Sequence, residues 1–450
     1  FKEKIWFEAG LELGDNQGKV CILTRALYGL RSSGSSWRSF FADSLISLGF
    51  KSTQADRDVW IRPASKDGFR YYEMVFVYVD DILVLSKDAN KIIDDLKESY
   101  EFKGGGAVVP DLYLGATIER TQRPDGSMAW AMSPKQYLQT AVKIVEGMLE
   151  ADGDKLRGKR YAKSPFAYNY RPELDCTPEL NSELASRYMQ LIGIARWAIE
   201  LGQIDIYLEV SVLSQHQALP REGHLDALYH IFAYIKYQLE DDSEHRIIFD
   251  AATPEVDCSH IKLHADWSDF YPDAREEIHD DMPEALGNPV LINCFVDANH
   301  AGNMVTRRSH SGIVIFVQQT PIIWFSKRQN TVETSTFGSE FVALRIAKEL
   351  IVALRHKLRS FGIPIVGPDG KIDGPAVVHC DNAGVVANTS TPESALTKKH
   401  LAVNYHSVRE GAAAGILVMS KEDTATNLAD PFTKVLDAGK RTAHFKCMLG

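Results

Sequence analysis

Four carboxylates in the last third of the chain stand in distinct local patterns, and three of them follow or sit among apolar residues. They are Asp297, Glu340, Asp381 and Asp430. An ionised carboxylate beside an apolar core is costly unless something compensates its charge, and several gathered at one place resist joint ionisation. Divalent cations relieve both costs, and Mg²⁺ prefers oxygen ligands. The chain is therefore expected to fold so that these acids share metal ions.

Two of the acids stand at the ends of predicted strands. Asp297 ends an apolar run over 291–296, and Asp381 follows another over 376–380. Two further strand-sized runs complete a meander with the first, over 312–317 and 321–325. Strands followed by alternating elements predict a mixed sheet with helices packed on it, so both acids can lie at one end of that sheet.

The other two acids are predicted on helices. The spacing of apolar residues predicts a long helix over 336–360, and Glu340 adjoins its buried stripe. Asp430 is expected in the last helix. Taken singly, each acid has a plain alternative, since Asp381-Asn382 suits a helix cap, Glu340 suits a solvated helix face, and Asp430-Pro431 suits a helix end. Taken together, the four predict a two-metal nuclease site, in which cations hold the attacking and leaving oxygens of a phosphodiester.

A second acidic pair, Asp80-Asp81, lies between the apolar runs 74–79 and 82–85. This pattern predicts a β-hairpin with the acids at its turn. A solvated turn is the plain alternative. A polymerase, however, needs carboxylates at such a tip to hold Mg²⁺ on the incoming triphosphate and the primer 3′-hydroxyl.

Composition sets outer limits on these interpretations. A length of 450 residues leaves room for two or three domains, and a net charge of -10 does not by itself indicate a nucleic-acid binder. Six scattered cysteines without a Cys-x-x-Cys pair argue against a disulfide framework or a zinc module and suit a reducing, intracellular setting such as a cytoplasmic particle or the nucleus. The longest apolar runs are too short to span a membrane. Because the chain begins at Phe1, it is expected to be a piece of a longer polypeptide.

Residues 291–436 resemble the RNase H domain of copia-type LTR retrotransposon polyproteins. The resemblance is carried by Val-Asp-Ala-Asn-His-Ala-Gly (296–302), Thr-Arg-Arg-Ser (306–309), Glu-Thr-Ser-Thr-Phe-Gly-Ser-Glu-Phe-Val-Ala-Leu (333–344), Cys-Asp-Asn (380–382), Lys-Lys-His (398–400) and Asn-Leu-Ala-Asp-Pro-Phe-Thr-Lys (427–434). Asn299 departs from the family, where a second Asp is frequent. The family's acidic tetrad falls on the four carboxylates named above.

The first part of the chain resembles the reverse transcriptase of the same polyproteins. The matching residues are Ala-Leu-Tyr-Gly-Leu-Arg-Ser-Ser-Gly (26–34) with Trp37, Tyr-Val-Asp-Asp (78–81), Asp-Arg-Asp-Val-Trp (56–60) and Tyr-Leu-Gly-Ala (113–116). The resemblance implies a partial reverse transcriptase palm with a helical thumb and connection, followed by an RNase H-like mixed five-stranded sheet with helices, so the expected fold class is α+β or α/β. The expected division is fingers and palm over 1–145, thumb and connection over 146–250, an acidic linker over 251–290, RNase H over 291–436 and a C-terminal tail over 437–450.

The resemblance also implies ligands and partners. Two Mg²⁺ per site are expected, with Asp80 and Asp81 as the polymerase acids, and the partners are an RNA–DNA hybrid, an RNA template, DNA, a tRNA primer and other polyprotein products, without a membrane. Expected nucleic-acid contacts are Tyr28, Gly29, Arg31, Ser33, Gly34, Arg307, Arg308, Lys327, Gln329, Lys398, Lys399 and His400. A solvated charged surface is the alternative for each basic residue taken singly.

One expected polymerase residue is missing. Reverse transcriptases take a further metal-binding Asp from a strand upstream of the Leu-Tyr-Gly-Leu segment, and none of Glu3, Glu8, Glu12 and Asp15 follows a suitable apolar run. We therefore expect cleavage of RNA in hybrids, with polymerase activity only if that Asp is supplied. A decayed element copy that binds nucleic acid, or is inert, is the alternative. An integrase fits poorly, because integrases carry three acids and this chain has no zinc-binding module.

Overall fold

The computed structural model describes residues 5–24, 30, 32–102, 107–123, 125–158, 162–167, 169–241 and 245–450. Three of the expected nucleic-acid contacts, Tyr28, Gly29 and Arg31, lie outside these residues. The chain forms two compact units. Unit 1 comprises residues 1–108, 280–288 and 356–363, and unit 2 comprises 109–279, 289–355 and 364–450.

Unit 1 is built on an antiparallel sheet whose strand order follows the sequence. Its strands are β3 (Lys51–Ser52), β4 (Val59–Lys66), β5 (Phe69–Tyr78) and β6 (Asp81–Leu85). Helices α1 (Ser33–Ser47) and α2 (Ala89–Lys97) pack against it around a core of Phe41, Leu45, Phe50, Trp60, Val75, Ile92 and Leu96. A separate ribbon pairs β1 (Trp6–Glu8) with β2 (Val20–Ile22), with a 3-10 helix, η1 (Leu11–Asn16), between them. The predicted hairpin is confirmed as β5 and β6.

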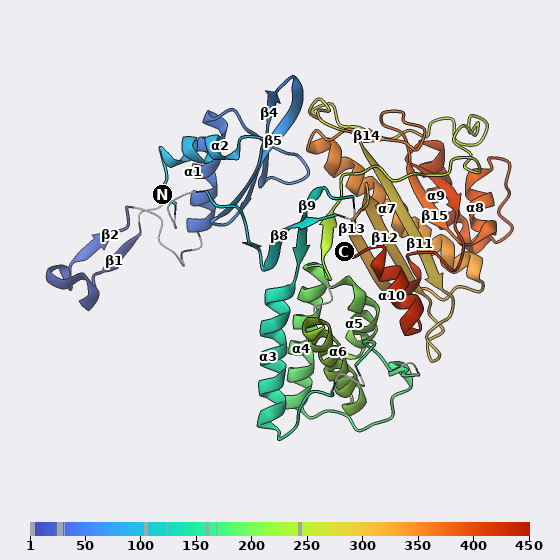
Figure 1. The fold of residues 1–450 in the computed structure, drawn as a ribbon, viewed down its shortest axis with the longest axis horizontal. Helices are drawn as coiled ribbons and strands as arrows, with labels where there is room; N and C mark the ends of the chain where they lie inside the picture. Colours follow the sequence, from blue (N-terminus) through green and yellow to red (C-terminus); the bar gives the residue numbers. More distant parts are fainter. Residues whose placement is uncertain are drawn as a thin grey trace. The chain divides into compact units, whose positions relative to one another are not determined.

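Unit 2 begins with an antiparallel sheet that leads into helices. The sheet has the order β10-β9-β8-β7, formed by β7 (Leu112–Tyr113), β8 (Ala116–Gln122), β9 (Met128–Ser133) and β10 (Ile247–Phe249). The helices, which we call the helical layer, span 135–240 (Figure 1): α3 (Lys135–Ala151), η3 (Pro172–Leu174), α4 (Ser182–Glu200), η4 (Ile204–Ile206), α5 (Tyr207–Leu213), η5 (Ser214–His216) and α6 (Glu222–Glu240). Apolar faces of α3, α4 and α6 meet in one core, in which Val145, Leu191 and Ile231 are fully buried.

A larger mixed sheet carries Asp297 and, at the end of another strand, the residue before Asp381. Its order is β13-β12-β11-β15-β16, from β11 (Val290–Asn299), β12 (His310–Val317), β13 (Thr320–Arg328), β15 (Ala376–Cys380) and β16 (Leu417–Lys421). The first three strands are antiparallel, and β11, β15 and β16 run parallel. A sixth short strand, β14 (Ile365–Val366), pairs with the start of β11, so the sheet has one strand more than the five expected.

Helices flank this sheet (Figure 1). The predicted long helix is confirmed as α7 (Thr336–Ser360), whose residues Phe341, Leu344 and Ile351 are fully buried. The remaining helical elements are α8 (Ala383–Ser390), η6 (Lys399–Leu401), α9 (Ala402–Ala413), η7 (Asp430–Phe432) and α10 (Ala438–Lys446). The prediction that Asp430 lies in the last helix is wrong, because Asp430 opens the single 3-10 turn η7. Pro431 accounts for this, because proline suits the first turn of a helix and not its interior.

Residues 251–279, which precede the large sheet and are rich in acids, belong to unit 2 with that sheet. Ile261 lies in a small core with Val377 and Val418 of the parallel strands. Glu276 accepts hydrogen bonds from the fully buried guanidinium of Arg355 at 2.6 and 2.8 Å. Burial of an arginine requires a paired and hydrogen-bonded carboxylate, so this acid has a structural role.

Helix α10 packs back on the helical layer. Arg441 donates to the Tyr234 hydroxyl at 2.7 Å, and its guanidinium lies 3.6 Å from the buried Asp205 carboxylate. Phe445, Met448 and Leu449 share a core with residues of η4, β10 and β12. Across the described part of the chain, no helix is both long and apolar enough to cross a lipid bilayer.

Candidate metal centre

Strand β11 fixes the first acid of the centre. Asp297 pairs with Gly312 of β12 and is 4% exposed, so its carboxylate is held at a buried position of the sheet. The Thr433 hydroxyl donates a short hydrogen bond to Asp297 Oδ2. Asn427 donates from Nδ2 to the Val296 carbonyl at 3.0 Å, which ties the segment carrying Asp430 to the same strand.

Parallel pairing brings the third acid beside the first. Val296 of β11 pairs with Cys380 of β15, so Asp381 follows directly where β15 ends. Asn382, and not Asp381, caps helix α8, because its Oδ1 accepts from the amides of Gly384 and Val385 at 3.1 and 3.2 Å. The helix cap therefore leaves the Asp381 carboxylate available to the site.

The four predicted acids converge. Asp297, Asp381 and Asp430 each offer a carboxylate oxygen, and these three oxygens lie within 4.8 Å of one another. Glu340 belongs to a second group that shares Asp381 with the first. In this group one ligand atom each of Glu340, Cys380 and Asp381 lie within 4.8 Å of one another. Oε2 of Glu340 is buried, and among the described residues it has no hydrogen-bond partner. Converging carboxylate oxygens with an unsatisfied buried acceptor fit a hard divalent cation.

Burial and mutual repulsion shape the protonation of these acids. Burial, together with the neighbouring carboxylates of Asp430 and Asp381 and against the opposing effect of Lys434, raises the pKa of Asp297 to about 6. Burial and the charges of Asp297 and Asp381 raise the pKa of Glu340 well above its usual value. Both shifts come first from burial, and the charges of the neighbouring carboxylates add to them.

Lys434 supplies one positive charge to the cluster. Its Nζ lies 2.8 Å from Asp430 Oδ1 and 3.9 Å from Asp297 Oδ2. Burial lowers the pKa of Lys434, but the surrounding carboxylates of Asp297, Asp430 and Asp381 outweigh it and raise the pKa overall. Sequence reasoning assigned no role to Lys434 or Thr433. Their spacing from Asp430, four and three residues along a helical turn, was the available signal.

Cys380 lies beside the acids without resembling a ligand for Mg²⁺. Burial, and then the charge of Glu340, raise the pKa of the Cys380 thiol well above its usual value. A thiol that stays protonated is a poor metal ligand, so the oxygen donors define the centre.

The expected nucleic-acid contacts lie in different surroundings. Arg307 and Lys327 are exposed, and Arg308 is half-buried. Gln329 is only 3% exposed, and its amide donates internally to Ser311 Oγ and the Ser339 carbonyl, so it is not at the surface. Near the start of α7, Lys398 donates to Ser335 Oγ at 2.6 Å, while Lys399 and His400 are exposed on η6. Ser33 and Gly34 are the first two residues of α1.

The second acidic pair is at the tip of the β5–β6 hairpin in unit 1. Tyr78 pairs with Asp81 across a two-residue turn, and both Asp80 and Asp81 are exposed. Val79 has a φ of 55°, which is costly for a β-branched residue. The Val79 carbonyl accepts a hydrogen bond from Trp37 Nε1 at 2.7 Å. Among the described residues, no third His, Cys, Asp or Glu joins these two acids in a metal-sized group.

Comparisons with known proteins cover both parts of the chain. Residues 3–146 match the family described as reverse transcriptase (RNA-dependent DNA polymerase). Over 94% of its length the chain is 24% identical to the retrovirus-related Pol polyprotein from transposon RE1 of Arabidopsis thaliana. Over 98% of its length it is 23% identical to the one from transposon TNT 1-94 of Nicotiana tabacum. The Ty1-DR1 Gag-Pol polyprotein of Saccharomyces cerevisiae is 22% identical over 97% of the chain.

The chain spans 24%, 29% and 22% of the length of these three relatives. Among solved structures, the N-terminal RNase H domain of rv2228c from Mycobacterium tuberculosis, fused to maltose binding protein, matches 35% of this chain and 97% of that chain. Its sequence identity is 16% and its TM-score is 0.24.

Proposed function

We propose a function on the premise that this chain is a segment of a copia-type retrotransposon polyprotein, as the relatives matched along its length indicate. In this proposal unit 2 carries an RNase H, formed within residues 291–436. This RNase H hydrolyses the RNA strand of an RNA–DNA hybrid. Residues 1–145 would then be the partial fingers and palm of the reverse transcriptase, and 146–250 its thumb and connection. The observation that carries the proposal is the approach of three carboxylate oxygens, from Asp297, Asp381 and Asp430, to within 4.8 Å.

The acids would divide the work of holding two Mg²⁺. Asp297, Asp381 and Asp430 would hold Mg²⁺ through carboxylate oxygens that lie within 4.8 Å of one another, and Glu340, within the same distance of Asp381, would add a further oxygen. When bound, the ions supply positive charge for the attacking water and the leaving 3′-oxygen. Thr433 orients Asp297 through its hydrogen bond, and Lys434 balances part of the cluster's charge.

Neutral replacements of the acids test this proposal. We expect Asp297→Asn, Asp381→Asn and Glu340→Gln each to lower hybrid cleavage in Mg²⁺ by more than about a hundredfold, because loss of even an indirect partner of a metal ligand costs about 10- to 100-fold. The thermal stability of Asp297→Asn and Glu340→Gln should equal or exceed that of the parent, since a buried carboxylate with a raised pKa is costly when charged. Cleavage of a labelled hybrid and the melting temperature are measured together.

Glu410→Gln on the exposed face of α9 is the matched control, and it should cleave at the parent rate. EDTA should abolish cleavage by the parent. Undiminished cleavage by Asp297→Asn or Asp381→Asn would refute the assignment. A parent that binds hybrids but cleaves none in Mg²⁺ would favour the alternative of a decayed element copy.

A further inference from the structure

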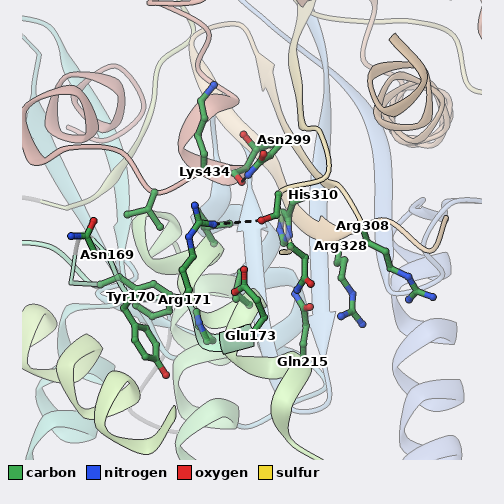
Figure 2. A pocket seen from close by; sticks show the side chains of 18 residues that line it. Asn169, Tyr170, Arg171, Glu173, Gln215, Asn299, Arg308, His310, Arg328 and Lys434 are labelled. Atoms are coloured by element: carbon green, nitrogen blue, oxygen red, sulfur yellow. Dashed lines mark hydrogen bonds between the residues drawn. The ribbon is translucent and has the colours of Figure 1, made fainter. Parts of the chain in front are cut away.

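Beside the acidic cluster, unit 2 contains a cavity of about 300 Å³ between the helical layer and the large sheet. Figure 2 shows its two walls: Tyr170, Arg171, Glu173 and Gln215 belong to the helical layer, whereas Arg308 and Arg328 belong to the sheet side. The cavity adjoins the candidate metal centre, because Thr433 and Lys434 also line it. A volume of this size accommodates one nucleotide unit but not a duplex.

The charges that line the cavity are unbalanced. Arg171, Arg308, Arg328 and Lys434 are cationic, and Glu173 is the one acidic residue among the described lining residues. Within the described part of the chain, no ion pair joins Arg308 or Arg328 to a carboxylate, and in Figure 2 the two side chains lie on the same side of the cavity. Partial burial and the charge of Arg308 lower the pKa of Arg328. Two adjacent, partly buried cations without a counter-ion are costly unless an anion joins them.

From the cavity, its unpaired arginines and its continuity with the acids, we propose that it holds a backbone phosphate of the nucleic-acid strand that crosses the metal centre. This inference rests on the proposed nuclease function and deepens it. Arg308 and Arg328 would bind the phosphate oxygens, since guanidinium groups suit bidentate contacts to phosphate. Asn299, whose Nδ2 donates to the Thr433 carbonyl at 3.1 Å, connects this wall to the segment that carries Asp430.

The helical layer contributes directly to the site in this arrangement. Arg171 Nη1 lies 3.5 Å from the Gly302 carbonyl, and Glu173 Oε1 accepts from the Met304 amide at 3.2 Å. These contacts dock the 170–173 segment on the loop between β11 and β12, so the cavity exists only when both layers are present. The inferred phosphate site is therefore shared between the helical layer and the large sheet. The negative charge of Glu173 weakens phosphate binding there.

Binding of a fluorescent RNA–DNA hybrid to the full chain tests the inference, measured by anisotropy in EDTA so that cleavage does not interfere. We expect R308A/R328A to weaken binding by about tenfold or more and to lower the slope of log affinity against log salt by about one, for the single phosphate that the two arginines share. Glu173→Gln keeps an acceptor for the Met304 amide and should strengthen binding. The matched control R157A/K440A removes two exposed cations outside the cavity and should stay within about twofold of the parent.

R308K/R328K separates charge from shape, and it should recover most of the salt dependence but less of the affinity. Parent-like affinity and salt slope in R308A/R328A, with an unchanged melting temperature, would overturn the inference even if the parent cleaves hybrids. Unchanged binding by Glu173→Gln would also contradict it. If instead the variants lose binding as expected but the parent cleaves nothing, the phosphate site stands and the nuclease proposal fails.

Discussion

At the scale of single residues, the protein buries several carboxylates, and their surroundings decide whether each one stays charged. Asp205 accepts from Tyr234 and Gln238 at 2.5 and 2.8 Å, and although burial opposes it, Arg441 and His245 help to lower its pKa overall. Glu209 lies one turn further along the same layer and is 4% exposed. Burial raises the pKa of Glu209 to about 7, against a lowering effect of Arg441. Neighbouring acids in one core therefore differ in charge near neutral pH.

Glu209 should make stability depend on pH. Its pKa is about 7 in the folded chain and 4.5 in the usual reference, so the folded state binds more protons between these values and the free energy of unfolding falls as pH rises through them. A pKa raised from 4.5 to about 7 corresponds to about 3 kcal/mol of stability lost between about pH 4.5 and 7. Glu209→Gln removes the titration, so its unfolding free energy relative to the parent should rise over that window, as urea titrations at several pH values would measure.

Glu150→Gln, at an exposed position of α3, is the control and should leave the pH profile unchanged. A parent and a Glu209→Gln variant with parallel stability profiles from pH 4.5 to 8 would show that Glu209 does not titrate in this window.

At the scale of elements, the metal centre depends on a close approach between strand β12 and the turn η7. A Cβ atom on Gly312 would lie 2.7 Å from the Ala429 carbonyl oxygen and 2.6 Å from Thr433 Cγ2. Only glycine permits this distance, and Gly312 is the direct partner of Asp297 in the sheet. The glycine thus sets how closely Asp430 can approach Asp297.

Gly312→Ala should therefore push η7 away from the sheet. Overpacking of a tight core costs about 1–3 kcal/mol, and we expect the unfolding free energy to fall by that amount and hybrid cleavage to fall at least tenfold. Thermal melts and cleavage rates at saturating Mg²⁺ measure the two effects. Gly147→Ala in the middle of α3, where the added Cβ meets nothing within 4 Å, should instead stabilise the protein by about 1 kcal/mol. Parent-like cleavage by Gly312→Ala would show that the approach is not needed.

Elements with strong periodicity were predictable from the sequence, and contacts between distant segments were not. The apolar stripe beside Glu340 predicts α7 with its observed bounds, and the two apolar runs on either side of Asp80-Asp81 predict the hairpin. The 3-10 turn at Asp430 was missed because one short turn has no period to detect. The pairing of Glu276 with Arg355 joins positions 79 residues apart, and composition alone predicted only an acidic linker over 251–290. Gln329 was expected to contact nucleic acid, whereas in the structure its side chain is buried. The sequence alone does not tell whether a polar side chain finds its hydrogen-bond partners at the surface or inside the protein.

At the scale of the whole molecule, the two acidic pairs lie in different units and differ in completeness. In unit 2 four acids from β11, α7, η7 and the end of β15 gather around one centre. In unit 1 Asp80 and Asp81 are exposed at a hairpin tip, and the described residues supply no third acid to them. Nucleotidyl transfer requires a complete metal clamp on the attacking and leaving groups, so we expect this chain to support the proposed hybrid cleavage without nucleotidyl transfer.

We expect residues 1–450 to cleave RNA in a hybrid without extending a primer. The measurement is extension of a labelled DNA primer on an RNA template with Mg²⁺ and all four deoxynucleotides, beside hybrid cleavage by the same preparation. Addition of an upstream segment that carries the missing Asp should restore extension, which serves as the positive control. Robust DNA synthesis by residues 1–450 alone would contradict this expectation.

The contact between Arg441 and Asp205 has a consequence for biogenesis. The two residues are 236 positions apart, and a ribosome that adds about 5–20 residues per second takes roughly 12–47 s to make the intervening chain. During that interval Asp205 lacks its arginine partner, and of the two groups whose positive charge lowers its pKa only His245 has been made. The ion pair between Asp205 and Arg441 can therefore form only late in translation, after all strands of the large sheet have been made.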